Sequence, residues 1–213
     1  MKLIVFGATG STGRQVVEQL LAKGHEVTAV VRQPGKFEMA HDRLIVIPGD
    51  VLDPSSIMAP MVGKHAVLSA LGANHRKPTT VYSEGTNNIM LAMQEAGVRR
   101  LICLSASALE IPPDTPFVPQ LIIRLIVQRL FKNLYEDMQR MERNVQRSGL
   151  DWTIIRPPRL TDSPSTGEYR IAVNEPMTKA KGLTGISRAD LADCMVSLLN
   201  NPASFQALIE ISY

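Results

Sequence analysis

Short apolar runs alternate along the chain with longer segments in which apolar residues recur every three or four positions. The short runs are rich in β-branched residues, as in strands, and the longer period is typical of helices. We therefore predict strands at 2–6, 26–31, 44–48, 66–70, 100–105, 152–156 and, more weakly, 207–211. Helices are predicted at 12–23, 54–60, 80–96, 120–148 and 188–200. This alternation indicates an α/β fold, a doubly wound and mostly parallel sheet with helices on both faces.

The ends of two predicted helices carry capping signals. Gly24 follows the first helix as a C-terminal cap, and Ser187 with Asp190 forms a capping-box-like start for the last one. The 213 residues contain no repeat and no low-complexity linker, so we expect a single domain over 1–213. Proline-rich 111–119 and loop-like 157–186 follow the fifth and sixth strands. Ligands bind at that edge of such sheets, so we expect substrate-side segments at 107–136 and 157–186.

Composition narrows the class of protein. The net charge of +3 is not gathered in one basic run, which favours small anionic ligands over nucleic acid. The first strand begins almost at once and no apolar stretch reaches the length of a membrane span, so we expect a cytoplasmic protein. Cys103 and Cys194 lie in apolar surroundings without a CxxC spacing, which predicts buried reduced thiols. The four histidines show no metal-ligand spacing, so no metal site is expected.

A glycine-rich loop, GATGSTG at 7–13, joins the first strand to the first helix. In this context the loop predicts a dinucleotide site. Gly7 would permit the tight turn, Gly10 would let the backbone approach a pyrophosphate, and Gly13 would let helix and strand pack closely. The hydroxyls of Thr9, Ser11 and Thr12 are further candidate donors. The alternative is an ordinary glycine-rich turn.

The end of the second strand distinguishes between cofactors. An NAD site places an acidic residue there for the ribose hydroxyls, whereas this chain has Arg32, followed by Lys36. A guanidinium can bind a 2′-phosphate and stack beside adenine, so the sequence favours NADP(H) over NAD. The alternative is that both residues are solvated surface cations.

Two later strand ends supply further cofactor candidates. Asp50 and Val51 follow the third strand, where Asp50 could face the adenine amino group or cap the helix that opens at Pro54. Leu71 and Gly72 follow the fourth strand, where small residues would leave room for the cofactor.

These motifs, with PTTVYSEGTNNI at 78–89 and SGLDWTIIRPP at 148–158, resemble the atypical short-chain dehydrogenases, and among them the branch that reduces flavins and biliverdin. The resemblance covers most of the chain and is weakest over 111–136. It implies a Rossmann domain that binds NADPH, with a planar acceptor such as a flavin or a linear tetrapyrrole over the nicotinamide. It also implies that Ser105 is the active-site serine and that Pro157 and Pro158 flank the nicotinamide.

The chain departs from related enzymes at two points. No tyrosine is followed by a lysine four positions later, so the acid pair of ordinary short-chain dehydrogenases is missing. Arg159 stands where the compared branch has a histidine; because arginine is a poor proton donor, we expect it to bind an anionic group or to cap its loop. His75, beyond the fourth strand, is a further candidate for contact with the substrate.

The segment 120–131 is apolar on most faces but contains Arg124 and Arg129. It could form a substrate lid, a dimer or membrane-surface helix, or a helix packed on the sheet. The leading functional interpretation is an NADPH-dependent reductase of flavins or similar conjugated acceptors. The alternatives are an NADP-binding redox-sensing regulator without turnover and an assembly factor that retains the fold; the sequence leaves the acceptor and the oligomeric state open.

Overall fold

The computed structural model describes residues 1–111, 117–177 and 185–213. At its centre is an eight-stranded sheet in the order β3-β2-β1-β4-β5-β6-β10-β8, in which every pairing is parallel except that of β10 with β8. The strands are β1 (Lys2–Phe6), β2 (Glu26–Val31), β3 (Leu44–Pro48), β4 (Ala66–Ser69), β5 (Arg100–Leu104), β6 (Asp151–Arg156), β8 (Arg170–Val173) and β10 (Ala207–Ser212). Beside it, β7 (Leu160–Thr161) pairs with β9 (Ile186–Ser187).

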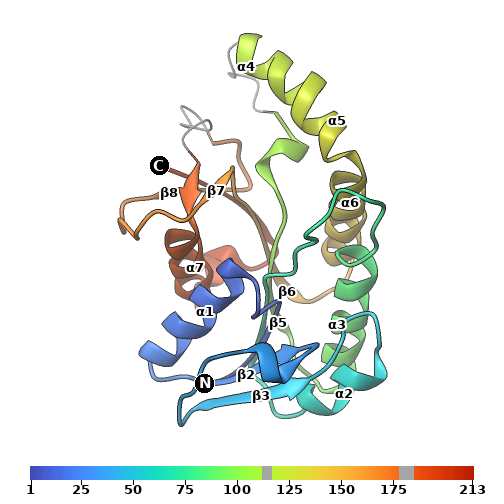
Figure 1. Cartoon of the computed structure of the whole chain (residues 1–213), viewed down its shortest axis with the longest axis vertical. Coiled ribbons are helices and arrows are strands. Elements are labelled where there is room, and N and C mark those ends of the chain that lie inside the picture. The colour runs from blue at the N-terminus through green and yellow to red at the C-terminus, as the bar shows by residue number, and fades with distance from the viewer. Residues whose placement is uncertain (112–116, 178–184) are drawn as a thin grey trace.

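Helices cover both faces of the sheet (Figure 1). α1 (Ser11–Ala22) and α7 (Arg188–Ser197) pack together on one face; α2 (Ser55–Met61), α3 (Ser83–Glu95) and α6 (Lys132–Gln146) cover the other. The chain winds outward from β1 through β2 to β3, then returns to β4 on the other side of β1 and winds outward again. This arrangement is the predicted doubly wound Rossmann fold, and the reversal between β1 and β4 is its topological switch point.

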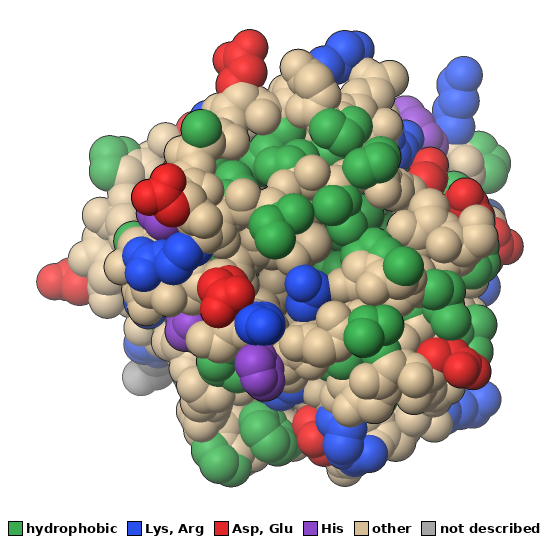
Figure 2. Space-filling view, turned by 90° about the horizontal axis from the view of Figure 1, so that it is seen from below, with side chains coloured by type: hydrophobic (Ala, Val, Ile, Leu, Met, Phe, Trp, Pro, Cys, Tyr) green, Lys and Arg blue, Asp and Glu red, His purple; other side chains and the backbone are tan. Residues whose placement is uncertain are grey.

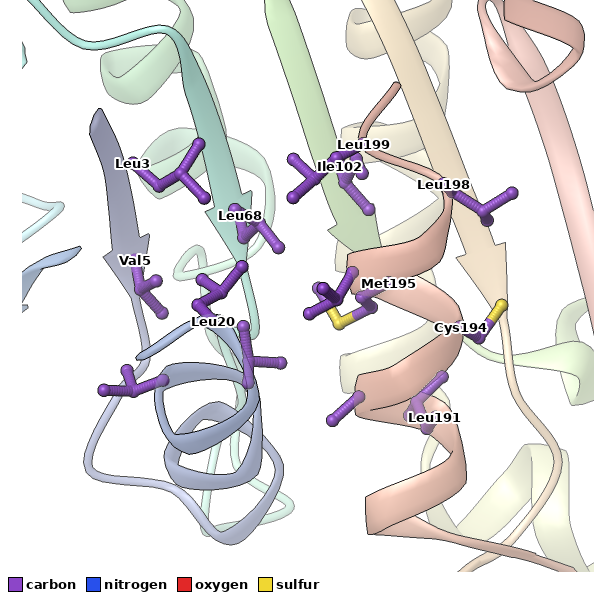
Figure 3. Packing of buried hydrophobic residues seen from close by; sticks show 14 of the residues in the cluster. Leu3, Val5, Leu20, Leu68, Ile102, Leu191, Cys194, Met195, Leu198 and Leu199 are labelled. Atoms are coloured by element: carbon purple, nitrogen blue, oxygen red, sulfur yellow. The ribbon is translucent and has the colours of Figure 1, made fainter. Parts of the chain in front are cut away.

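Alternate residues of each strand point into one of two apolar layers. In β1, Leu3 and Val5 face α1 and α7, while Ile4 and Phe6 face α3 and α6, and all four are essentially inaccessible to solvent. Figure 3 shows the first layer, with side chains from the strands and from helices α1 and α7 meeting between them. Cys194 belongs to this layer and Cys103 to the other, and both are buried free thiols, as predicted.

The two predicted helix caps are confirmed. Gly24 adopts φ +84° and donates its N–H to Leu21 O at 2.9 Å, which closes α1. The Ser187 hydroxyl accepts a 2.9 Å hydrogen bond from Asp190 N at the start of α7. The sequence predicts both helix ends because capping depends on residue type and local spacing.

The prediction of one helix over 120–148 is wrong. The chain forms α4 (Phe117–Ile122), a π-helical segment (Ile123–Val127) and the short α5 (Gln128–Leu130), and then leaves helical geometry at Phe131 before α6 begins. Contacts from other segments accompany the break: Arg76 lies over the Phe131 ring, 5.0 Å from its centroid, and Asn133 donates to Arg76 O at 2.9 Å. α4 and α5 extend beyond the body of the molecule, so packing on the sheet is also wrong for them (Figure 1).

The loop-like interpretation of 157–186 also needs correction, because this segment contains β7 and β8. β8 joins the sheet edge through antiparallel pairing with β10, from Ile209 opposite Val173 to Ser212 opposite Arg170. Parts of both expected substrate-side segments, 112–116 and 178–184, lie outside the described residues. Within the described part, no helix is long and apolar enough to cross a membrane.

Candidate functional site

The glycine loop lies at the switch point, against the end of β4. Gly7 has φ +76°, and a Cβ placed on it would stand 2.3 Å from the Ala70 carbonyl oxygen. Both the left-handed backbone and the close approach of two strand ends therefore require glycine at this position. The sequence predicts a tight turn at Gly7. The structure shows in addition that Gly7 lies against the backbone of residues 70–71, which brings the loop beside Leu71.

Gly13 and Gly10 differ in their surroundings. A Cβ on Gly13 would lie 2.1 Å from the Gly7 carbonyl oxygen, so only glycine lets α1 pack this closely on the loop. A Cβ on Gly10 would lie 3.4 Å from the same oxygen, and Gly10 is exposed. Thr12 is buried, whereas Thr9 and Ser11 are exposed where α1 begins. The unpaired N–H groups of the first turn of a helix attract anions, as a pyrophosphate site requires.

Two cations follow β2 without partners. Arg32 and Lys36 are exposed, and neither side chain forms a hydrogen bond or an ion pair within the described residues. Arg14, which follows the glycine motif and is not part of it, donates to Glu38 O at 2.9 Å and so ties the segment after Lys36 to the first turn of α1. Both cations are thus available to a ligand, and the segment that carries Lys36 is held near the glycine loop.

Asp50 does not cap α2. Its Oδ1 accepts from Leu52 N at 3.0 Å, whereas Asp53 Oδ1 accepts from Ser55 N at 3.1 Å at the helix start. The capping interpretation of Asp50 is therefore wrong, and its second carboxylate oxygen accepts no hydrogen bond from the described residues. Asp50 is half-buried and follows β3 through Gly49.

Val51 and Leu71 are brought together by α3. A Cβ on Gly85 would lie 2.8 Å from Val51 Cγ2 and 3.5 Å from Leu71 Cδ1, so both side chains pack against the bare backbone of that helix. Gly72 is exposed, and no atom lies within 4 Å of the place a Cβ would take. The edge beyond β4 is therefore open.

Ser105 has an unsatisfied hydroxyl. It directly follows β5, is buried, and its Oγ has no hydrogen-bond partner. Its N–H donates to Ile155 O at 2.8 Å, and Ser107 N–H donates to Pro157 O at 3.0 Å. These two bonds hold Ser105 beside the Pro157-Pro158 segment, which lies 52 residues later in the sequence.

The two predicted substrate residues are exposed. The Arg159 side chain forms no hydrogen bond or ion pair within the described residues, whereas its carbonyl oxygen accepts from Ile186 N at 2.8 Å. The backbone of Arg159, not its guanidinium, thus stabilises the loop. His75 is exposed in the segment beyond β4, and no contact of its side chain joins it to Arg159.

A buried aspartate on α6 positions the start of α3. Asp137 is fully buried and accepts from Tyr82 N at 2.9 Å, from Ser83 N at 3.4 Å and from the Ser83 hydroxyl. The Tyr82 hydroxyl in turn accepts from Ala73 N at 3.1 Å, and burial raises the pKa of Tyr82. This chain of bonds holds the segment after Gly72. An acidic residue at a core position of an amphipathic helix is the signal that could have identified it.

A buried ionic cluster lies on the same face of the sheet as Ser105. Arg156 donates to both carboxylate oxygens of Glu142, at 2.9 and 2.7 Å, and to Glu110 at 2.8 Å. Glu210 stands opposite Arg156 in the neighbouring strand. Burial raises the pKa of Glu210 to about 7, Arg156 opposes that rise, and Glu110 and Glu142 add to it.

A pocket of about 530 Å³ adjoins the start of α1. Asp190 positions Ser165, one of the pocket's lining residues, by accepting a 2.6 Å hydrogen bond from the Ser165 hydroxyl. It also accepts from the Tyr213 hydroxyl at 2.6 Å and from the Thr166 and Gly167 N–H groups. Burial raises the pKa of Asp190, but these bonds outweigh it and lower the value well below the usual range. The lining residues are Ser11, Gln15, Asp162, Ser163, Pro164, Ser165, Arg188 and Ala189.

Comparison with known proteins identifies the family. A family model described as NAD(P)H-binding matches residues 7–202, from the glycine loop to beyond α7. The chain belongs to the NAD(P)H-binding family. This assignment and the fold confirm the resemblance to atypical short-chain dehydrogenases, and the predicted cofactor, NADP(H), belongs to the class that the family binds.

An uncharacterized chloroplastic protein of Arabidopsis thaliana is 29% identical over 97% of this chain and 75% of its own length. A short-chain dehydrogenase/reductase from Veillonella parvula in complex with NADP has a TM-score of 0.82 and 16% identity, covering 100% of this chain and 94% of that one. A candidate NADH-flavin reductase from Streptococcus pneumoniae has a TM-score of 0.75 and 24% identity, covering 100% and 99%. The two solved structures show that this fold is shared by proteins of low sequence identity.

Proposed function

We propose that this protein is an NADPH-dependent reductase that transfers hydride to a flavin or a similar conjugated acceptor, as biliverdin reductase B does. The unpartnered, buried Ser105 hydroxyl at the carboxyl edge of the sheet carries the proposal. Leaving a buried hydroxyl unpaired costs free energy, which a bound cofactor or acceptor would recover by supplying the partner. The Streptococcus pneumoniae protein, which has the same fold, is named for the same class of acceptor.

The cofactor residues fit NADP(H) in shape and charge. The pyrophosphate would lie on the glycine loop and the N–H groups of α1, and the 2′-phosphate against Arg32 and Lys36, whose charges no acidic side chain neutralises within the described residues. The edge at Gly72 is open and leaves room for the cofactor. The proposed contacts are Gly7, Thr9, Gly10, Ser11, Thr12, Gly13, Arg32, Lys36, Asp50, Val51, Leu71, Gly72, Pro157 and Pro158.

Little acid catalysis is needed for this chemistry. NADPH supplies a hydride when bound. Ser105 donates a hydrogen bond that orients the nicotinamide or the acceptor, and the Pro157-Pro158 segment forms the adjoining wall. A flavin that accepts hydride spreads the resulting negative charge over its ring, so water can supply the proton. Positioning is then most of the catalysis, which agrees with the missing Tyr/Lys pair.

Arg159 and His75 are the proposed substrate contacts. An exposed guanidinium without an acidic partner binds phosphate or carboxylate well, so Arg159 would bind an anionic group of the acceptor or the cofactor pyrophosphate. Arg159→Ala should raise the KM for flavin mononucleotide or for NADPH by about tenfold. If neither value changes, Arg159 has no binding role.

An acceptor panel tests the proposed reaction. NADPH oxidation is followed with flavin mononucleotide, riboflavin, biliverdin and a quinone, and NADP binding is measured in parallel by calorimetry. We expect saturable turnover with at least one flavin or biliverdin. Binding of NADP without turnover of any acceptor would instead favour the redox-sensing regulator, and the absence of binding would refute both functions.

A further inference from the structure

The projecting segment that contains α4 and α5 exposes an unusual amount of apolar surface. Seven of its large apolar side chains are between 42% and 73% exposed. We call this set the apolar tip; it comprises Phe117, Val118, Leu121, Ile122, Leu125, Ile126 and Leu130. Scattered exposed apolar residues are ordinary, whereas a contiguous group marks a surface that contacts a partner or a membrane.

The apolar tip forms rows along one side of the segment. Its members recur at intervals of four, in the rows 117, 121, 125 and 118, 122, 126, 130. In a regular α-helix such rows drift around the axis, because one turn takes about 3.6 residues. The π-helical segment Ile123–Val127 rotates the chain less per residue and so reduces the drift. The tip is therefore a continuous apolar strip.

The charge around the strip has one sign. Arg124 and Arg129 are exposed on the segment, and the sequence contains no acidic residue from position 117 to 135. Arg76 is held at its base, where it lies over the Phe131 ring, and Lys77 is the next residue in the chain. None of these four cations forms an ion pair within the part of the chain that the structure describes.

The opposite end of the molecule differs. Seen from below, its apolar side chains lie among both acidic and basic ones (Figure 2). Between residues 117 and 135 the apolar tip instead combines a strip of large apolar residues with basic side chains and no acidic one. Burying the strip in the acyl boundary while the arginines reach lipid phosphates satisfies both features. In a symmetric dimer through the strip, the arginines of the two copies would approach one another, which opposes association.

We propose that the apolar tip docks the protein on the surface of an anionic lipid bilayer, with Arg124, Arg129, Arg76 and Lys77 contacting the headgroups. This places the carboxyl edge of the sheet near the membrane, since α4 is the first α-helix that follows β5 and Ser105 in the described chain. Membrane docking is independent of the proposed reductase activity, because neither the strip nor its cations belong to the proposed cofactor contacts.

Vesicle co-sedimentation of the full chain tests this docking. Vesicles of phosphatidylcholine alone are compared with vesicles containing about 30% phosphatidylglycerol, and each cation near such a surface contributes about fivefold in binding. We expect binding only to the anionic vesicles, weakening as salt rises. Arg124→Gln with Arg129→Gln should lower it by about 25-fold. The matched control is Arg143→Gln with Arg147→Gln at the C-terminal end of α6, which removes two exposed cations elsewhere and should leave binding within about twofold.

The apolar contribution is tested by Ile122→Glu with Ile126→Glu. Both positions are exposed, so circular dichroism and thermal unfolding should match the wild type while vesicle binding is lost. Equal binding to neutral and anionic vesicles, or none to either, overturns the proposal. So does a wild-type dimer in analytical ultracentrifugation that this double variant converts to a monomer, because a second copy would then cover the strip.

Discussion

At the scale of single residues, the site contains positions that only glycine can occupy and a buried polar group without a hydrogen-bond partner. Gly7 and Gly13 stand where any Cβ would collide with backbone, and Ser105 retains an unpaired hydroxyl in the interior. The glycines were predictable because their roles depend on a short motif between a strand and a helix. The missing hydrogen-bond partner of Ser105 was not predictable, because the surroundings of this residue include β6, which lies far away in the sequence.

Ser105→Ala separates a ligand-binding role from a structural one. Because the hydroxyl has no partner in the free protein, its removal should leave the free energy of unfolding unchanged or slightly higher, while kcat falls about tenfold. Urea unfolding and steady-state kinetics measure the two effects. Thr153→Val is the matched control, because the Thr153 hydroxyl donates to Ser204 O at 2.5 Å, and its loss should cost about 1 kcal/mol. A similar loss of stability in Ser105→Ala would mean that the hydroxyl is structural.

At the scale of elements, the strands and most helices follow from periodicity and caps, whereas the broken helix does not. No glycine or proline occurs between 120 and 148, so local propensity favours one continuous helix. Contacts from Arg76 and Asn133 accompany the turn at Phe131, and the Gln128 side chain donates to Ala108 O at 2.9 Å. Such long-range contacts are invisible to periodicity, as was the edge strand β8, whose four residues carry no clear alternation.

Asp137 links α6 to the start of α3 and so affects the site. Asp137→Ala would leave the N–H groups of Tyr82 and Ser83 and the Ser83 hydroxyl without partners, so we expect a loss of about 3 kcal/mol in the free energy of unfolding. Urea denaturation measures it. Arg140→Gln removes only the half-exposed ionic partner of Asp137 and should cost less than about 1 kcal/mol. Equal losses in the two variants would contradict the role given to the α3 bonds.

At the scale of the whole molecule, the order of the strands gathers residues far apart in sequence at one edge. The glycine loop after β1, Arg32 after β2, Gly72 after β4 and Ser105 after β5 all follow parallel strands. Alternation of strands and helices predicts this gathering, because it forces parallel pairing. Arg156 lies within the 148–158 motif, but nothing in the sequence indicates that it pairs with Glu142 of α6.

The ionic cluster predicts a pH dependence of stability. Since the pKa of Glu210 rises from 4.5 to about 7 on folding, the folded state holds its proton more tightly than the unfolded state. Its contribution is therefore complete below pH 4.5 and is lost as pH rises toward 7. Glu210→Gln should flatten the stability profile in this window, measured by urea unfolding at each pH, whereas Glu168→Gln at an exposed position should not. An unchanged slope in Glu210→Gln would exclude Glu210 as its source.

The central claim is NADPH-dependent hydride transfer, and the ratio of kcat/KM for NADPH and NADH with one flavin acceptor tests it most directly. Arg32 is free to bind the 2′-phosphate, so we expect NADPH to be preferred by at least about tenfold, from one charge-assisted hydrogen bond or more. Arg32→Asp should abolish or reverse that preference by weakening NADPH much more than NADH. Equal losses for the two cofactors, or no turnover of either, would contradict the account.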